Sequence, residues 1–173
     1  MSSFAEFSGL LPERTDFECI PVGLVENAPA RQALAIWNDL RGARRFPSRD
    51  ELKLRDIAAI IQQMSLIAVI DGGRDFENRF VGDAVVRAHE VPIAHRRFSE
   101  IAKDMPVLME RLWSQCRRVV DTGEPLAYRG RTGHDMTRVV YTDFEGVLLP
   151  FGPDAVDHVM YAGSCALRIA TSA

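Results

Sequence analysis

The pattern of apolar and polar positions predicts an amphipathic helix from Pro29 to Gly42. Ala33, Trp37 and Leu40 recur at three- and four-residue spacing and form one apolar stripe. A proline suits the first turn of a helix and a glycine suits its end, so both boundaries agree with the stripe. This segment is expected to lead the folded domain.

A second and longer helix is predicted before Gly123. Asp104 can cap its first turn, and Pro106 suits the first helical position. Its apolar stripe consists of Met105, Leu108, Met109, Leu112, Trp113, Cys116, Val119 and Val120. This is the clearest helical pattern in the sequence.

Shorter helical signals lie between these two segments. Ser48 followed by Glu51 is a capping-box pattern, and the apolar positions after it predict one short helix that ends near Gln63. Residues 82–90 can form another short helix, and residues 99–102 a single turn.

Two strands joined by a tight turn are predicted in the middle of the chain. Met64–Ile70 is almost continuously apolar, Asp71-Gly72-Gly73 is a hairpin signal, and Phe76–Val81 alternates. The alternation places Phe76, Asn78 and Phe80 on one face and Glu77, Arg79 and Val81 on the other.

Three further strands are predicted after the long helix, at residues 125–131, 138–151 and 156–169. Turn residues at 132–135 and 152–154 separate them. Successive strands joined by short turns form an antiparallel meander, so the sequence predicts an α+β fold with the helices gathered on one face of the sheet.

The domain organisation follows from length and pattern. The 173 residues are 47% hydrophobic and 26% charged, which suits a single core. Residues 1–28 lack a sustained period and are expected to form an irregular arm that contains one short strand at DFECIPVG. Residues 29–173 are expected to form one domain that includes the leading helix.

Charge and cysteine content exclude several classes of function. The formal net charge of −3 gives no basic surface for nucleic acid. No apolar run is long enough to span a membrane and no amino-terminal leader pattern occurs, so we expect a cytoplasmic protein without membrane contact. The three cysteines lack a C-x-x-C pair, which argues against a zinc knuckle or a disulfide framework.

Four short motifs together resemble the small bacterial group of PAS-like domains. They are Trp37 with Leu40-Arg41-Gly42; Pro47-Ser48-Arg49; Arg79-Phe80-Val81-Gly82; and Leu148-Leu149-Pro150, which leads through the turn at 152–154 to Val156-Asp157-His158. The resemblance covers residues 30–169. It implies a five-stranded antiparallel sheet of order 2-1-5-4-3 whose concave face and helices enclose a cavity for a small molecule, haem, flavin or nothing. It also implies a role in signal transduction.

The sequence contains no motif for catalysis or metal binding. The N-C-R-F-L helix of flavin photosensors is missing, and so are H-E-x-x-H, G-x-S-x-G and the phosphate-binding glycine loops. Cys116 lies on the apolar stripe of the long helix, where a core role is expected. Haem remains open because His89 and His95 lie in the connecting region, although no specific motif supports haem or flavin.

Six residues are candidates for contact with a ligand. Arg79 lies in an apolar strand and needs a carboxylate or a ligand anion, and pairing with Asp50, Asp56 or Asp83 is the favoured explanation. The others are Tyr128, Tyr141, Tyr161, Trp113 and His89.

The leading helix is the candidate surface for a partner, either a second copy or another signalling protein. Its candidate residues are Trp37, Leu40, Arg41, Arg44 and Arg45. The arginines of this turn, with Arg49, can alternatively bind phosphate, or they form a solvated turn that stacks on Trp37.

The expected function is therefore a stand-alone PAS-like sensory or regulatory domain that binds a small ligand or a protein partner. Because few residues follow the last predicted strand, its signal is expected to leave by association. The alternative is a small cone-shaped α+β enzyme or carrier in which Asp157, His158 and Tyr141 surround an apolar pocket. Strand alternation places Asp157 and His158 on opposite faces, which weighs against a shared active site.

Overall fold

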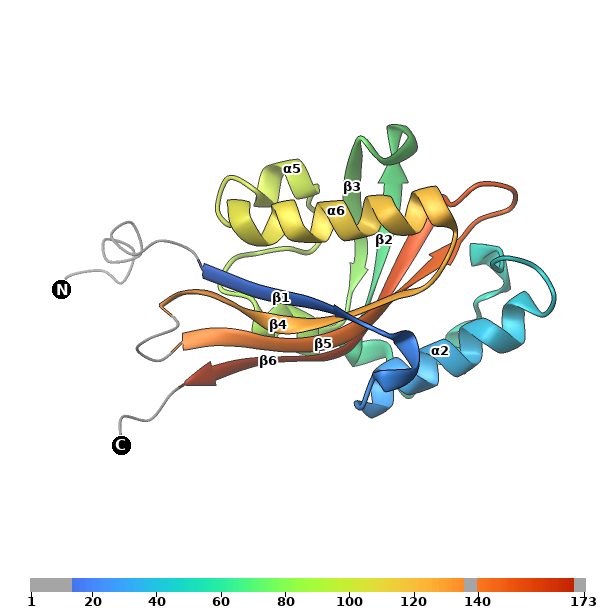
Figure 1. Ribbon diagram of the computed structural model, residues 1–173, viewed down its shortest axis with the longest axis horizontal. Helices are drawn as coiled ribbons and strands as arrows, with labels where there is room; N and C mark the ends of the chain where they lie inside the picture. Colours follow the sequence, from blue (N-terminus) through green and yellow to red (C-terminus); the bar gives the residue numbers. More distant parts are fainter. Residues whose placement is uncertain (1–13, 136–139, 170–173) are drawn as a thin grey trace.

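The computed structural model describes residues 14–135 and 140–169, which form one antiparallel sheet with helices packed on it (Figure 1). The strands are β1 (Arg14–Ile20), β2 (Met64–Ile70), β3 (Asp75–Val81), β4 (Leu126–Asp135), β5 (Val140–Phe151) and β6 (His158–Ile169). The α-helices are α2 (Ala28–Arg41), α3 (Leu54–Ile57), α4 (Asp83–Ala88), α5 (Phe98–Ile101) and α6 (Pro106–Thr122). Short 3-10 turns lie at Val22–Leu24, Arg49–Glu51, Ile61–Gln63 and Asp71–Gly73.

The α+β class is as predicted, but the sheet has six strands in the order β1-β4-β5-β6-β2-β3 instead of five. The additional strand is β1, which pairs with β4 from Arg14 opposite Gly133 to Ile20 opposite Ala127. The short strand expected at DFECIPVG is therefore present, although it begins earlier, at Arg14, and belongs to the main sheet. Phe17 explains the pairing, because its ring stacks on that of Tyr128 with 4.7 Å between the ring centroids.

Helix α2 forms at the predicted residues because both of its ends are well capped. The side chain of Asn27 accepts a hydrogen bond from the Ala30 amide, and Gly42 ends the helix with a positive φ of 57°. The apolar stripe faces inward, and its indole N–H at Trp37 donates to the Pro150 carbonyl over 2.7 Å. Trp37 is only 3% exposed, which disfavours direct contact with a partner, and its role in partner binding stays a prediction.

The helices cover both faces of the sheet, which corrects the expectation that they gather on one (Figure 1). The Asn27 side chain at the start of α2 donates to the Glu145 carboxylate of β5 over 2.8 Å. The neighbouring Phe144 points the other way and lines a cavity together with Met109 of α6. Because successive strand residues face opposite sides, α2 and α6 lie on opposite faces.

The region between α2 and β2 is broken into pieces where one short helix was predicted. The Glu51 carboxylate accepts from the Ser48 amide over 2.7 Å, as the capping-box pattern indicated. Leu52 and Lys53 are then extended, and Asp56 accepts from the Lys53 amide over 3.3 Å. The predicted helix is therefore divided into the 3-10 turn Arg49–Glu51 and the short helix α3, each with its own cap at its start.

The remaining elements agree with the sequence patterns except at two places. Residues 132–135, expected as a turn, belong to strand β4. In β3 the pairing with β2 shifts so that Leu66 is opposite Phe80 and Ile67 opposite Asn78, which leaves Arg79 as a bulge. Phe80 is 37% exposed for this reason. Among the described residues, no helix has the length and apolar character that crossing a bilayer requires.

Replacing Trp37 by Ala is expected to lower the free energy of unfolding by about 3–5 kcal/mol, because it leaves a void between α2 and the sheet. Urea denaturation measures this loss. The change should leave the oligomeric state unaltered in light scattering.

Gln32→Ala on the exposed side of α2 is the matched control and should change stability by less than about 0.5 kcal/mol. A Trp37→Ala protein that is as stable as this control but dissociates from an oligomer would support the partner role.

Candidate functional site

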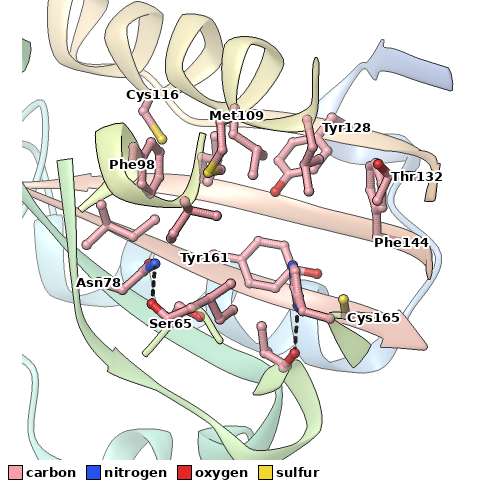
Figure 2. A pocket seen from close by; sticks show the side chains of 18 residues that line it. Ser65, Asn78, Phe98, Met109, Cys116, Tyr128, Thr132, Phe144, Tyr161 and Cys165 are labelled. Carbon is pink, nitrogen blue, oxygen red and sulfur yellow. Dashed lines mark hydrogen bonds between the residues drawn. The ribbon is translucent and has the colours of Figure 1, made fainter. Parts of the chain in front are cut away.

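A largely apolar cavity of about 70 Å³ lies between α6 and the sheet (Figure 2). Cys116 and Met109 descend into it from α6, and Phe98 closes it from α5. The sheet contributes Tyr128 and Tyr161 among other residues. The cavity is partly enclosed, and most of its wall is apolar.

The floor of the cavity depends on a glycine. A Cβ atom at Gly146 would overlap the ring of Tyr161 on the neighbouring strand. The missing side chain therefore lets this ring lie flat on the sheet, where its centroid is 6.2 Å from that of Tyr128. Phe144 completes the aromatic group, with its centroid 5.7 Å from that of Tyr128.

Polar side chains border the cavity at a few points. The Asn78 amide donates to the Ile93 carbonyl over 3.0 Å, and the Tyr161 hydroxyl donates to the Ser164 carbonyl over 3.2 Å. Thr132 shares a hydrogen bond of 2.7 Å with Thr15. These bonds tie the cavity wall to the surrounding backbone.

His89 lines the cavity, and its Nδ1 lies 2.7 Å from the Val85 carbonyl oxygen. Burial lowers the pKa of His89, although the hydrogen bond to Val85 and the charge of Glu90 act against this. The imidazole is therefore neutral near pH 7.

The cavity is too small for haem or flavin as it stands. Its volume of about 70 Å³ compares with about 300–1,000 Å³ for typical pockets that hold drug-sized ligands. Either cofactor would have to displace α6 or the segment from α4 to α5. Within residues 14–135 and 140–169, no group of three or more His, Cys, Asp or Glu residues is arranged to hold a metal ion.

Three of the six predicted ligand residues lie in the cavity wall, namely Tyr128, Tyr161 and His89. Trp113 is next to the cavity, where its ring meets the edges of Phe76 and Phe98 at centroid distances of 6.5 and 6.4 Å. Tyr141 belongs to β5, but its side chain lies outside the described part of the structure.

Arg79 is exposed at the bulge of β3 and does not line the cavity, so it is not placed to contact a ligand there. Its partner is Glu77 at 3.1 Å and none of the predicted aspartates. Sequence reasoning also missed Ser65 and Asn78 as wall residues. A signal for Asn78 was present, since an amide on the same strand face as Phe76 has to find partners in the core.

The arginines predicted for partner contact are engaged within the chain. Arg41 lies over the Trp37 ring at 5.0 Å, and Arg44 forms an ion pair of 2.6 Å with Glu51. Arg45 donates to the Thr122 carbonyl at the end of α6. Leu40 is half-buried against the core. The basic turn therefore braces the fold, as its structural interpretation suggested.

The acid and base proposed for an enzyme lie outside the cavity wall. Nδ1 of His158 is 2.8 Å from the Asp157 carboxylate, and Asp157 is exposed. Neither side chain is among those that line the cavity.

A second, open depression lies over the other face of the outer strands. Several of its charged residues are paired with one another, as in Arg129 with Glu18 at 3.3 Å and Arg131 with Asp143 at 3.8 Å. Paired and solvated charges on an open surface give little selectivity for a ligand.

No family model, curated protein or solved structure matches this chain.

Replacing Gly146 by Ala is expected to lower the free energy of unfolding by about 1–3 kcal/mol, because the new methyl group displaces the Tyr161 ring. Gly23→Ala is the control, since a Cβ there meets nothing within 4 Å. Urea denaturation compares the two variants. Equal stability of both would show that the glycine does not support the cavity floor.

The stability of the protein is expected to fall below about pH 6.5 because of His89. The unfolded chain binds a proton there more readily than the folded chain, so the free energy of unfolding decreases as the pH falls toward the lowered pKa. Urea denaturation at about pH 7.5 and about pH 5.5 measures the difference.

His89→Asn keeps a donor for the Val85 carbonyl and should flatten this pH dependence. His95→Asn is the control, because His95 is exposed and Asn tolerates its φ of 58°. If both variants keep the dependence of the original protein, His89 is not its source.

Proposed function

We propose that the chain is a PAS-like sensory or regulatory domain that binds a small molecule in the cavity between α6 and the sheet and has no catalytic activity of its own. The observation that carries this proposal is the cavity itself. It is partly enclosed and mostly apolar, and a few polar groups border it, as in binding sites for small molecules.

The order of the strands supports the comparison with PAS domains. When β1 is set aside, the other five strands lie in the order β3-β2-β6-β5-β4. Numbered along the chain, this is 2-1-5-4-3. The helices α4, α5 and α6 all connect β3 to β4, and they cover the face that bears the cavity.

The segment from α4 to α5 offers a route for the signal. Val85, Ile93 and Phe98 of this segment line the cavity, so an occupant would touch them directly. Side chains of the sheet hold the segment in place, with Asn78 bonded to the Ile93 carbonyl and Thr142 to the Ala88 carbonyl. A bound molecule would therefore change the mobility or position of this cover, which a protein partner or a second copy could read. The exposed side of α2 remains available for the same contact.

A small-molecule carrier is the second candidate, and the same apolar cavity favours it. An enzyme is less well supported, since Asp157 and His158 lie outside the cavity wall. A carrier and a sensor differ in their response to the ligand. Binding to a sensor should alter amide hydrogen exchange in residues 83–101 beyond the cavity wall, whereas a carrier needs only local protection.

Filling the cavity tests the proposal. Cys116→Leu from α6 and Ser65→Val from β2 each reduce the free space and should abolish stabilisation by any molecule that raises the melting temperature of the original protein in a small-molecule screen. Native mass spectrometry of the purified protein gives a second reading of bound molecules.

Ser114→Leu on the exposed side of α6 is the matched control and should bind like the original protein. Equal binding by the filled variants and by this control would place the ligand elsewhere. A complete lack of small-molecule binding by the original protein would leave a pure interaction role.

A further inference from the structure

The described wall of the cavity contains no Asp, Glu, Lys or Arg side chain. A charged ligand would lose its hydration on entering and would find no opposite charge in return, which costs several kcal/mol or more for an unpaired ion. The wall residues therefore favour an occupant without a charge.

The titratable groups of the wall are themselves neutral near pH 7. Burial raises the pKa of the Cys116 and Cys165 thiols to about 12, and it raises the pKa of the Tyr128 hydroxyl as well. His89 is neutral because its pKa is lowered. No wall group therefore acquires a charge that would attract an ion.

Two hydroxyl groups of the wall have no hydrogen-bond partner among the described residues, those of Tyr128 and Ser65. Tyr128 is 4% exposed and Ser65 is also 4% exposed. Every fully enclosed side-chain nitrogen or oxygen in the described parts of the chain does have a partner. The two hydroxyls must therefore border free space, and Figure 2 shows the Tyr128 oxygen directed into the cavity.

The Tyr161 hydroxyl provides the contrast within the same cavity. It already donates to the Ser164 carbonyl of its own strand over 3.2 Å. Of the two facing tyrosines, only Tyr128 keeps a donor for an occupant. The surrounding rings of Phe144 and Tyr161 offer flat apolar surfaces to the rest of the molecule.

We propose that the cavity binds a small uncharged molecule with an apolar or aromatic body and one oxygen that accepts a hydrogen bond from Tyr128. This inference rests on the proposed small-molecule function and specifies the chemical class of the ligand. The volume of about 70 Å³ is roughly half of the about 150 Å³ in which an apolar cavity binds benzene. A ligand built on one benzene ring therefore enters only if the cover formed by α4 and α5 moves outward, and a larger ligand is excluded.

Three probes of nearly equal shape separate the classes of ligand: benzyl alcohol, benzoate and benzylamine. Isothermal titration near neutral pH is expected to show binding of benzyl alcohol and at least about 100-fold weaker binding of both charged probes. Chemical shifts of amides around the cavity identify the site. Toluene serves as the apolar probe without an oxygen.

Tyr128→Phe removes only the proposed donor. It should weaken the binding of benzyl alcohol about 10-fold and leave the affinity for toluene unchanged. Ser114→Ala on the exposed side of α6, away from the cavity wall, is the control and should bind both probes as the original protein does. A Tyr128→Phe protein that binds benzyl alcohol with full affinity would overturn the role of Tyr128.

The outcomes distinguish this inference from the proposed function. Binding of benzoate or benzylamine in the cavity, equal to or tighter than that of benzyl alcohol, would overturn the neutral class and leave small-molecule binding intact. If neither the neutral nor the charged probes bind in the cavity, and water alone occupies it, both this inference and small-molecule binding at this site are wrong.

Discussion

The central strands β5 and β6 are covered on both faces, by α2 on one side and by α6 on the other. Val147, Leu148 and Leu149 follow one another in β5, and each is at most 1% exposed. Consecutive residues of a strand face opposite sides, so a strand of this kind needs cover on both faces. The Trp37 stripe supplies one cover and the α6 stripe the other, and the cavity is the part of the second interface that side chains leave unfilled.

Sequence patterns predicted the elements whose signals are local. The ends of α2 and α6 follow from a proline in the first turn and a glycine at the end, and the apolar run of β2 is bounded by the Asp71-Gly72-Gly73 turn. Pairing between distant segments has no such local signal. Strand β1 joins β4 more than a hundred residues later, and a period alone does not show whether the Trp37 stripe meets a sheet of its own chain or another molecule.

The candidate site was predictable to the extent that it follows strand alternation. Tyr128 and Tyr161 were placed on late strands as possible wall residues, and both line the cavity. Arg79 lies on the side opposite to Asn78, as simple alternation gives, and pairs with Glu77 of its own strand. The bulge that follows Asn78 instead turns Phe80 toward solvent, and bulges have no clear sequence signal here. Asn78 precedes the bulge and keeps the inward direction that simple alternation gives it.

The cavity is a liability for stability that a single substitution could remove. By the scale observed for buried voids, about 24 cal/mol per Å³, its 70 Å³ costs on the order of 2 kcal/mol. A larger side chain at Ser65 or Cys116 would occupy the space. An occupant that replaces the lost contacts would recover part of this free energy. Because α4 and α5 form one wall of the cavity, some of these new contacts would stabilise that cover. Binding energy and the order of the cover are therefore linked by the same contacts, which is the physical requirement for a domain that converts occupancy into a change at its surface.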